Sequence, residues 1–505
     1  MKPAREVILG LDVGTTAVKV VGFPISGGSG PLPSMQREYP LLQPEAGWQI
    51  QDPPTVLAAI DDALRGCVDL VGDGSIAAVS ISTAMHGLIG LDSETNPVTP
   101  LVTWADSRAA DQARQLRARG LAHELLERTG TPVHPMSPLL KLMWFGAHEP
   151  ELLARAQWWV GLKDYVLQHL TGQLVTELSS ASATGLLDLR SRDWDSQSLK
   201  LAGIRPNQLP RVLPTTAVLT LTAEAASRTE LPAGLPVVVG AADGPLGNLG
   251  TGAIQPGIAG LSMGTSGAVR MAVPAPRLDP AGRLFCYALT EDVWVVGGAV
   301  SNGGIALRWA GGAFTPDLLG GHADSKLLAL AEQVPAGSDG LVMLPYVLSE
   351  RAPLWDPDLT GAFLGVRHHH TRSHFLRAAL EGVCLQVSTI VDSLDTVSPV
   401  QAIRGTGGPF RSALWQRVMA AVLARPFYIQ AHAGGTALGA AALGWYALGG
   451  APTLIESLVA LGGPAAQDES EPVAVSAEEI STYAQVRAII PALIDSYREV
   501  ASLFA

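Results

Sequence analysis

The feature that most constrains the fold is a short Gly-rich motif that occurs once in each half of the chain. GLDVGTTA at residues 10–17 corresponds to GLSMGTSG at residues 260–267, with the Gly, Leu, Gly and Thr positions unchanged. Each copy follows the start of an apolar strand and continues into another, so each predicts a β-hairpin closed by a tight turn. Because internal repeats indicate a duplicated fold, we predict two similar α/β domains that each present one hairpin turn to a shared cleft.

The rest of the sequence alternates between predicted strands and helices, as expected of an α/β protein. The apolar spacing predicts a hairpin over residues 6–23 and further strands at 35–41, at 76–85 and within 231–250. Helical spacing covers residues 53–71, 121–130, 141–172 and the end of the chain from about residue 476. We place the domains at residues 1–245 and 246–460, and an acidic linker with a C-terminal helix packed on the second domain at residues 461–505.

Charge and cysteine content narrow the class of partner and the compartment. The 505-residue chain has a net charge of -12, which disfavours nucleic acids and anionic membranes as partners. Its three cysteines are far apart in sequence, so they support neither a disulfide framework nor a thiolate zinc site. Glu6 and Asp12 interrupt any signal-peptide core, and no apolar run approaches the ~18 residues of a membrane span. We therefore expect a cytoplasmic protein without nucleic-acid or membrane partners, and we keep a homodimer open as its assembly.

Both hairpin turns carry groups that suit phosphate oxygens. Successive backbone N–H groups and hydroxyls in a tight turn form a concave array of hydrogen-bond donors. Two such turns that face each other would hold a polyphosphate from both sides, and a lysine in the first hairpin adds a positive charge. The residues assigned to phosphate binding are Gly14, Thr15, Thr16 and Lys19 in the first copy and Gly264 and Thr265 in the second.

Asp12 is the one charged difference between the two copies, where the second has Ser262. A carboxylate beside a phosphate is repulsive unless a cation lies between them. Mg²⁺ is commonly held by one or two carboxylates together with substrate phosphates. We therefore predict that Asp12 is a Mg²⁺ ligand and that only one turn carries an acid because one metal position is needed. The alternative is that Asp12 caps the turn and Lys19 is a solvated strand residue.

Other phosphate-binding devices are absent from the sequence. The dipeptide GK does not occur, so there is no Walker loop. No credible G-x-G-x-x-G opens a helix after the first strand, and the protein-kinase signature set is missing. A pair of facing hairpins is the phosphate-binding arrangement that remains.

Two longer stretches carry a resemblance to a known family. The first turn resembles the phosphate motif of the actin, heat-shock ATPase and sugar-kinase superfamily, and MSPLLKLMWF (136–145) and GAFLGVRHHHTRSHFLRAALE (361–381) resemble the signatures of the FGGY carbohydrate kinases. The resemblance extends from residue 7 to about residue 448. It implies two ribonuclease-H-like domains that flank a deep cleft, ATP as the phosphoryl donor, and a small sugar or sugar acid as the acceptor, with the sugar on the first domain and the nucleotide on the second.

Asp243 is the candidate catalytic base. It lies in GAADGPLG, directly after the apolar strand LPVVVG, so it would emerge at the carboxyl end of a strand, where α/β clefts bind ligands. Phosphoryl transfer to a hydroxyl needs a carboxylate that accepts the hydroxyl proton, and the resemblance places the family's catalytic aspartate at this position. The alternative is that Asp243, beside a glycine, is an ordinary turn residue.

Two Gly-rich loops of the second half are assigned to the nucleotide by resemblance. Glycines allow the backbone to approach a ligand closely. GTGGPFRS (405–412) resembles the family's adenosine loop and SNGGIALRW (301–309) its turn near the ribose and phosphates. Ala421 and Gly434 stand where relatives often carry acids, so we expect a backbone cradle rather than recognition by side chains. The assigned residues are Gly303, Gly304, Gly407, Gly408, Pro409, Arg411 and Ser412.

The acceptor is expected on the first half, at the stretches STAMHGLIGLD (82–92) and TWADSRA (103–109). The side chains of these stretches could pack on a sugar face, accept hydrogen bonds from hydroxyls and pair with an anion. Each residue taken alone is equally consistent with a core or a surface position. Together with HPMSPLLKLMW and KDYVLQHLTG they resemble the gluconate kinase branch, which implies phosphorylation of D-gluconate to 6-phosphogluconate, with xylulose or another ketose or polyol as the alternative acceptor. The residues assigned to the acceptor, besides Asp243, are Met85, His86, Trp104, Asp106 and Arg108.

Several points stay open at this stage. A carboxylated acceptor would pair with Arg108, Lys141 or Lys163, and the sequence does not choose between them. An actin-like or heat-shock-like ATPase without an acceptor and a catalytically silent ligand sensor are the competing functions. Intact Asp12, Lys19 and Asp243 and the acceptor-like stretches favour the kinase. The run His368–His370, at the start of a predicted helix and without acidic partners at ligand spacing, indicates a solvated or capping role rather than a metal site.

Overall fold

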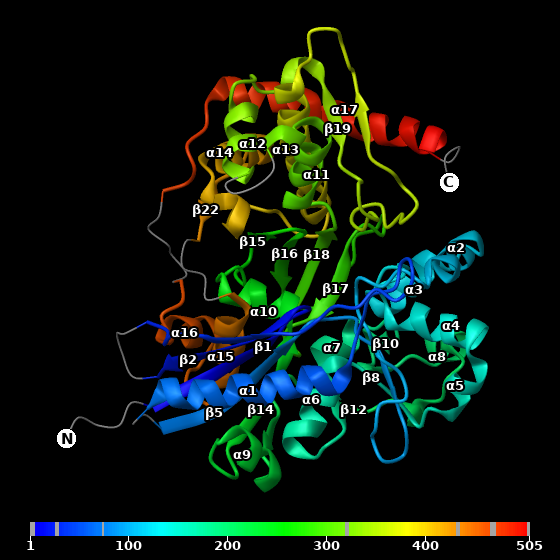
Figure 1. Cartoon of the computed structure of the whole chain (residues 1–505), viewed down its shortest axis with the longest axis vertical. Coiled ribbons are helices and arrows are strands. Elements are labelled where there is room, and N and C mark those ends of the chain that lie inside the picture. Colours follow the sequence, from blue (N-terminus) through cyan, green and yellow to red (C-terminus); the bar gives the residue numbers. More distant parts are fainter. Residues whose placement is uncertain are drawn as a thin grey trace, which may run out of the picture.

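One six-stranded sheet forms the centre of each half of the protein (Figure 1). The computed structural model describes residues 6–25, 30–72, 75–318, 323–430, 435–464 and 471–501. The first sheet has the order β13-β14-β5-β1-β2-β3, and the second has the order β17-β18-β16-β15-β21-β22. The strands of the first sheet are β1 (Glu6–Val13), β2 (Ala17–Pro24), β3 (Met35–Glu38), β5 (Ser75–Thr83), β13 (Val218–Thr220) and β14 (Pro236–Ala242). Those of the second are β15 (Ile258–Met263), β16 (Gly267–Val273), β17 (Phe285–Ala288), β18 (Trp294–Val300), β21 (Ala402–Thr406) and β22 (Phe427–Ile429).

The two sheets share the same pairing pattern around the repeated motif. In the first, β1 pairs antiparallel with β2 and parallel with β5, which in turn pairs parallel with β14. In the second, β15 pairs antiparallel with β16 and parallel with β21, which pairs parallel with β22. The predicted duplication is therefore confirmed: both copies of the motif are hairpins at equivalent positions of equivalent sheets.

Two helices cross between the halves, and glycines make this close packing possible. Helix α10 (Asp243–Gly250) leaves the end of β14, and α15 (Gly435–Ala447) returns from the second half to lie against β1 and β5. A Cβ at Gly439 would overlap the carbonyl oxygen of Leu246 in α10, and a Cβ at Gly10 would overlap that of Ala437 in α15. Figure 1 shows α15 and the following helix α16 (Leu454–Ala460) beside β1 and β2.

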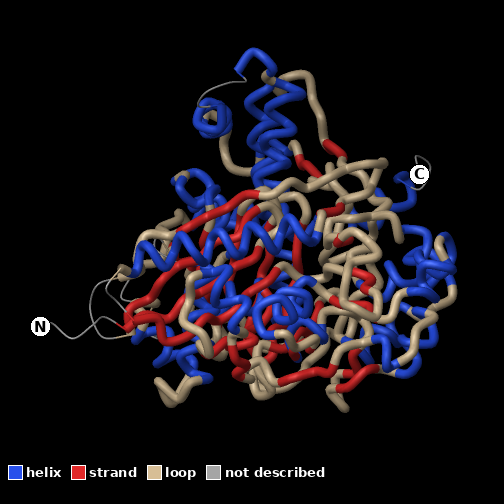
Figure 2. The backbone as a smooth tube through the Cα atoms, turned by 60° about the horizontal axis from the view of Figure 1, so that its bottom comes forward, coloured by secondary structure: helices blue, strands red, loops and turns tan. Residues whose placement is uncertain are grey.

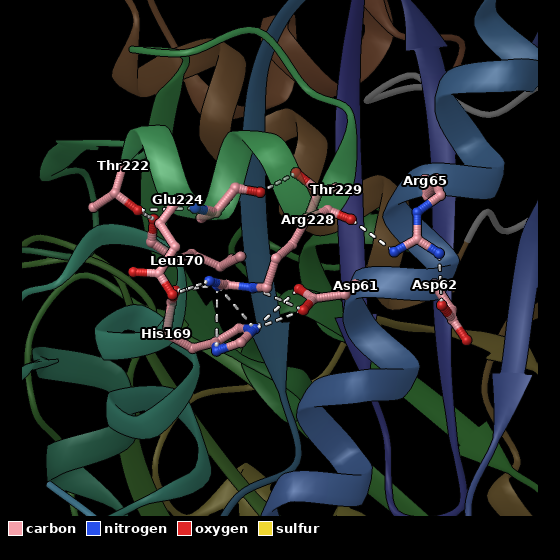
Figure 3. A network of polar contacts seen from close by, with 10 residues as sticks. Asp61, Asp62, Arg65, His169, Leu170, Thr222, Glu224, Arg228 and Thr229 are labelled. Atoms are coloured by element: carbon pink, nitrogen blue, oxygen red, sulfur yellow. Dashed lines mark hydrogen bonds and ion pairs between the residues drawn. The ribbon is translucent and has the colours of Figure 1, made fainter.

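The outer face of the first sheet is covered by α1 (Pro53–Val71), and two short helices pack beside it. Asp52 caps α1, because its carboxylate accepts the backbone N–H of Thr55. The two neighbouring helices are α6 (Leu162–Thr171) and α9 (Ala223–Thr229). Figure 3 shows how the three are tied together: Asp61 of α1 accepts from His169 Nε2 at 2.9 Å and from Arg228 Nε at 3.0 Å.

A smaller helical layer follows the first sheet and has its own apolar core. The predicted continuous helical segment at 141–172 is wrong in its middle. Residues 158–160 form the short strand β8, which pairs antiparallel with β6. The helix is interrupted because Pro150 starts a new helix and the Trp-Trp-Val sequence favours a strand. The remaining elements of the first half are β4 (Ile50–Gln51), β6 (Ile89–Leu91), β7 (Leu101–Val102), α2 (Ala110–Ala118), α3 (Ala122–Thr129), α4 (Pro138–His148), α5 (Pro150–Arg155), β8 (Trp158–Val160), β9 (Val175–Glu177), α7 (Leu178–Ser182), β10 (Leu187–Asp188), β11 (Asp193–Trp194), α8 (Ser196–Ala202) and β12 (Arg211–Leu213).

Helices pack on the second sheet and form the largest apolar core of the protein. The C-terminal helix α17 lies across α13 and α14, where Tyr483 donates a 2.6 Å hydrogen bond to Glu381 and so anchors it (Figure 1). In Figure 2 the strands run through the interior and helices surround them. The remaining elements are α11 (Gly304–Phe314), α12 (Ala323–Glu332), β19 (Val342–Leu344), β20 (Ala362–Leu364), α13 (Arg372–Asp395), α14 (Ala413–Leu423) and α17 (Ala477–Ala501).

The division into domains at residues 245 and 460 stays a prediction. Helix α10 begins in the first sheet and leads into the second half, while α15 and α16 of the second half pack on the first sheet. The halves are thus joined by an exchange of helices at their base. Within the described residues, none of the helices combines the length and the apolar character needed to cross a bilayer.

Candidate active site

The two hairpin turns meet at a pair of adjoining cavities. The first, which we call the aspartate cavity, has a volume of about 440 Å³ and contains Asp243 together with residues from both halves. The second, the glycine cavity, has a volume of about 760 Å³ and lies on the second half. Gly264 and Thr265 of the second turn line both cavities. Molecules bound in the two cavities could therefore both contact this turn.

The first hairpin turn is held in place by side chains from outside the hairpin. The turn closes through a hydrogen bond from Gly14 N–H to Ala17 O at 3.0 Å, and Tyr39 donates to Gly14 O at 2.6 Å. Trp104 Nε1 donates to Thr15 Oγ1 at 2.8 Å. Thr15 and Trp104 line the aspartate cavity, whereas Thr16 and Lys19 do not. Lys19 instead lies opposite Asp12 in the register of β1 and β2.

The second hairpin turn is packed against the start of α11. The N–H of Gly304 donates to Gly264 O at 2.8 Å, and the N–H of Gly303 donates to Thr265 O at 3.0 Å. Gly407 has a φ of +121°, and a Cβ there would overlap the Met263 carbonyl oxygen. Gly303 and Gly407 are thus needed for the second hairpin turn to pack closely against these loops. The sequence interpretation had assigned the two glycines only to nucleotide contact.

Most of the other residues assigned to the nucleotide line the glycine cavity. A Cβ at Gly408 would meet no atom within 4 Å, so the backbone of this loop is open to a ligand. Ala421 is buried in the core of the second half and does not line the cavity, and Gly434 lies outside the described residues. The assigned residues that line the cavity are Gly264, Thr265, Gly304, Gly408, Pro409, Arg411 and Ser412.

Two carboxylates lie close enough to influence each other. Asp243 is the first residue of α10, and its Oδ1 accepts the N–H of Gly244 at 2.8 Å. Asp12 accepts a 3.0 Å hydrogen bond from Ser82 Oγ. Burial and then the charge of Asp243 raise the pKa of Asp12 to about 7. Burial also raises the pKa of Asp243, although the positive charge of Arg270 opposes this.

Lys163 is close enough for its charge to act on both carboxylates, but its ammonium group donates its hydrogen bonds to backbone carbonyl groups. Its Nζ donates to the carbonyl oxygens of Ile81, Val239 and Ala241 at 2.5, 2.8 and 3.0 Å, which joins β5 to the irregular end of β14. Burial lowers the pKa of Lys163 to about 8. Its charge acts on Asp12 and Asp243, but its side chain does not line the aspartate cavity.

The other two basic residues considered as partners of an acceptor carboxylate are also occupied. Lys141 Nζ donates to the carbonyl oxygens of His86, Val102 and Thr103. Arg108 forms a buried ion pair with Asp106 at 2.8 Å and stacks 3.6 Å from the ring centre of Trp48. The structure therefore does not bring Asp106 and Arg108, predicted as acceptor contacts, to the cavity, because the two side chains satisfy each other.

His86 lies on the wall of the aspartate cavity with Met85 and Trp104. Its Nδ1 is 2.8 Å from the carbonyl oxygen of Ala183, which fixes the tautomer with the proton on Nδ1. Burial and the nearby Lys141 lower the pKa of His86 to about 3. The imidazole is therefore neutral at physiological pH, and its Nε2 is a hydrogen-bond acceptor suited to a hydroxyl group.

Two arginines on the cavity wall were missed by the sequence interpretation. Arg270 of β16 donates from Nη1 to Ser262 Oγ at 3.3 Å, and Ser262 is the residue that replaces Asp12 in the second copy of the motif. Arg351 donates to Ser301 Oγ and Val300 O and lies 4.8 Å from the ring centre of Trp104. A signal for Arg270 existed: it is the one charged residue of an otherwise apolar strand, the same argument that singled out Asp12.

Comparison with known proteins decides the family. Residues 7–250 match the N-terminal domain of the FGGY family of carbohydrate kinases, and residues 259–448 match its C-terminal domain. The chain belongs to the FGGY family. This FGGY kinase is 38% identical to the gluconokinase of Bacillus subtilis over 454 residues, which is 88% of each chain. The crystal structures titled gluconate kinase and ligand-bound xylulose kinase from Lactobacillus acidophilus each align with a TM-score of 0.92 and 32% identity, and cover 99% of this chain and 100% of theirs.

Family membership confirms the predicted class of enzyme and of fold. The protein is a sugar kinase, which transfers a phosphoryl group to an alcohol group of a carbohydrate, and the family implies ATP as the donor. The arrangement of two α/β halves around the cavities is that of the sugar-kinase and actin superfamily. The run His368–His370 lies in the turn before α13, where His370 Nδ1 accepts from Arg367 N–H at 3.0 Å, and His374 in the first turn of the helix accepts from Thr371 N–H at 3.1 Å. Over the described ranges, no three His, Cys, Asp or Glu side chains group as a metal site.

Proposed function

We propose that the protein transfers the γ-phosphoryl group of ATP to D-gluconate, with 6-phosphogluconate as the product. The observation that carries this proposal is the position of Asp243. It lies on the wall of a cavity that meets the glycine cavity at a single turn, so an acceptor hydroxyl and a nucleotide phosphate could meet beside it. The 38% identity to a gluconokinase supports gluconate as the acceptor.

Asp243 is the proposed general base. A carboxylate in this position accepts the proton of the hydroxyl as that oxygen attacks the γ-phosphorus, and the phosphorus–oxygen bond to ADP breaks. The base must be ionised to work. Arg270 and Lys163 both favour the charged form of Asp243 and so offset the effect of burial on its pKa.

The two turns are proposed to hold the phosphates from opposite sides. Thr15 and Thr16 offer N–H and hydroxyl donors from the first half, in the turn that the Gly14 N–H closes, with the charge of Lys19 behind them. Thr265 offers the same groups from the second half, beside Gly264 at the junction of the two cavities. Adenosine then lies in the glycine cavity, along the open backbone at Gly408.

Asp12 fits a magnesium ion. Its carboxylate has a single hydrogen bond, from Ser82, and the neighbouring charge of Asp243 disfavours its ionised form, so a divalent cation would relieve an existing repulsion. When bound, Mg²⁺ neutralises charge on the phosphate oxygens of ATP. Asp12 would hold this ion. Asp243 is the second carboxylate nearby, close enough for its charge to act on Asp12.

The acceptor is proposed to lie against Met85, His86 and Trp104, with His86 Nε2 accepting a hydrogen bond from a hydroxyl. Xylulose is the second candidate, because the structural match to a protein titled xylulose kinase equals that to the gluconate kinase. A homodimer stays a prediction.

A coupled assay with ATP, Mg²⁺ and a panel of D-gluconate, D-xylulose, ribulose and glycerol tests the proposal. We expect the highest kcat/KM for gluconate. A higher kcat/KM for xylulose would replace gluconate by the second candidate, and ATP turnover that no acceptor stimulates would reject the kinase mechanism.

A further inference from the structure

Two arginines line the aspartate cavity, where the charge of Asp243 acts on Arg270 without forming an ion pair with it. Neither Arg270 nor Arg351 takes part in an ion pair within the part of the chain that the structure describes. Both side chains line the cavity, and Arg351 is only 8% exposed. By contrast, buried Arg108 and Arg377 each pair with a carboxylate. The two cavity arginines therefore differ from Arg108 and Arg377 in having no carboxylate paired with them.

The charges around the cavity do not balance. Asp243 is the one acidic residue among the described residues that line it, against two guanidinium groups. Burial and the charge of Arg270 lower the pKa of Arg351 to about 10, although the charges of Glu350 and Asp243 act in the opposite direction. A buried charge is costly unless an opposite charge or several hydrogen bonds compensate for it. A bound anion would supply that compensation.

Both guanidinium groups keep donors that are free for a ligand. A guanidinium has five N–H groups, and two of them can bind one carboxylate side by side. Arg351 uses Nε for Ser301 and Nη2 for Val300, which leaves Nη1 uncommitted. Arg270 uses only Nη1, for Ser262. The protein thus fixes the two side chains from behind and leaves hydrogen-bond donors available at the cavity.

We propose that Arg270 and Arg351 form the subsite that binds the carboxylate of the acceptor. This inference rests on the proposed function and adds the chemical reason for a sugar acid. Arg270 lies next to the start of α10, where a Cβ at Gly244 would be 3.2 Å from Arg270 Nε. An open-chain acid with its carboxylate at the arginines would have its hydroxyls along the cavity wall that Asp243 also lines. Arg108, Lys141 and Lys163, the candidates from the sequence, are excluded from this task by their own hydrogen bonds.

A nucleotide phosphate is the other anion that the arginines could bind. Neither arginine lines the glycine cavity, where the adenosine is proposed to lie, so a competing phosphate would be one held at the two turns that line the aspartate cavity. Arg351 also lies over Trp104, on the side of the cavity formed by His86 and Trp104 of the first half. The subsite is therefore placed with the acceptor and not with the adenosine.

Direct binding measurements on the full-length protein test the proposal. Isothermal titration calorimetry would give the Kd of D-gluconate, of the uncharged six-carbon polyol D-glucitol, and of Mg-ATP, for the wild type and for Arg351→Gln and Arg270→Gln. Arg351→Lys is included as a variant that keeps the charge but loses the planar fork. Arg372→Gln is the matched control, because Arg372 forms an exposed ion pair with Asp317.

We expect Arg351→Gln and Arg270→Gln each to weaken gluconate binding by about 10- to 100-fold, the range for a hydrogen bond to a charged group. Binding of D-glucitol and Mg-ATP should change by less than about threefold, Arg351→Lys should recover part of the gluconate affinity, and Arg372→Gln should match the wild type. Equal losses for gluconate and glucitol, or a loss confined to Mg-ATP, would overturn the proposal.

The same data separate this inference from the proposed function. If the wild type phosphorylates a neutral sugar in preference to gluconate, the proposed function fails. The subsite then fails as well only if gluconate binding is insensitive to both Gln variants. If gluconate is the preferred acceptor but its affinity does not respond to either arginine, the subsite is wrong and the proposed function stands. Where a Gln variant does not fold, as judged by circular dichroism, the Lys variants at both positions decide the result.

Discussion

Asp243 is the side chain whose replacement isolates the chemical step. We expect Asp243→Asn to lower kcat for gluconate by about 10²- to 10⁴-fold, the usual contribution of a general base, because the amide cannot accept the proton. The Kd of Mg-ATP should stay within a few-fold, since the glycine cavity is unchanged. Steady-state kinetics and nucleotide titration check both numbers. Turnover close to the wild type would remove Asp243 from the role of base.

Asp12 is tested through the magnesium requirement. We expect Asp12→Ala to raise the Mg²⁺ concentration for half-maximal activity by at least about tenfold, or to abolish activity, because the remaining carboxylate, Asp243, would have to act alone on the ion. Titration of activity with Mg²⁺ at saturating ATP measures this. An unchanged titration curve would show that Asp12 has a structural role only.

His86 makes a pH-dependent contribution to stability. Its pKa is lowered from 6.5 to about 3 in the folded protein, so below pH 6.5 the unfolded chain binds a proton that the folded protein does not. Above pH 6.5 His86 does not reduce the free energy of unfolding. Between pH 6.5 and about 3 the free energy of unfolding decreases by about 1.4 kcal/mol for each pH unit that the pH falls. Urea unfolding of wild type and His86→Gln at pH 7 and pH 5 should therefore show the wild type losing more stability. Equal losses would contradict a buried neutral imidazole.

The candidate site was only partly predictable at the level of residues. Asp12, Thr15 and Asp243 were found because a polar residue that ends an apolar strand needs a reason to be there. Arg108, Lys141 and Lys163 were left open as partners of an acceptor carboxylate, and the structure pairs each of them within the protein, since the sequence shows a charge and not the partner that already satisfies it. Arg351 lies in an irregular loop, where no periodicity marks it.

At the level of elements, the crossing of α10 and α15 depends on glycine. We expect Gly439→Ala to destabilise the protein by about 1–3 kcal/mol, because its Cβ would overlap the Leu246 carbonyl oxygen and force the helices apart. Gly312→Ala in α11 is the control. Its Cβ would meet no atom within 4 Å, so we expect a gain of about 0.5–1 kcal/mol from helix propensity. Urea denaturation measures both, and equal effects would contradict the tight crossing.

The hairpins, α1 and α17 were predictable because a single periodicity covers each of them. The strand β8 was not, since it has three residues and is held by pairing with the distant β6. The exchange of α15 onto the first sheet was also hidden. Its Ala- and Gly-rich sequence is apolar on every side, so it shows that the helix is buried without showing against what.

At the level of the whole molecule, contacts across the cavities indicate how the halves close. Arg114 of the first half pairs with Asp358 of the second at 2.7 Å, Arg117 donates to the Trp355 carbonyl oxygen, and Arg351 lies over Trp104. Closure of this kind excludes water from the transferred phosphoryl group. We expect X-ray scattering to show a smaller radius of gyration with gluconate and a non-hydrolysable ATP analogue than without ligands. Superimposable profiles would argue against closure.

The central claim is that a sugar acid is phosphorylated at the cavity that Asp243 shares with the two arginines. Its most direct test is the ratio of kcat/KM for D-gluconate to that for D-xylulose, measured with purified protein and with the phosphorylated product identified by mass spectrometry. We predict a ratio well above one, with 6-phosphogluconate as the product, and a fall of at least about tenfold in that ratio for Arg351→Gln. A ratio below one in the wild type would contradict the account.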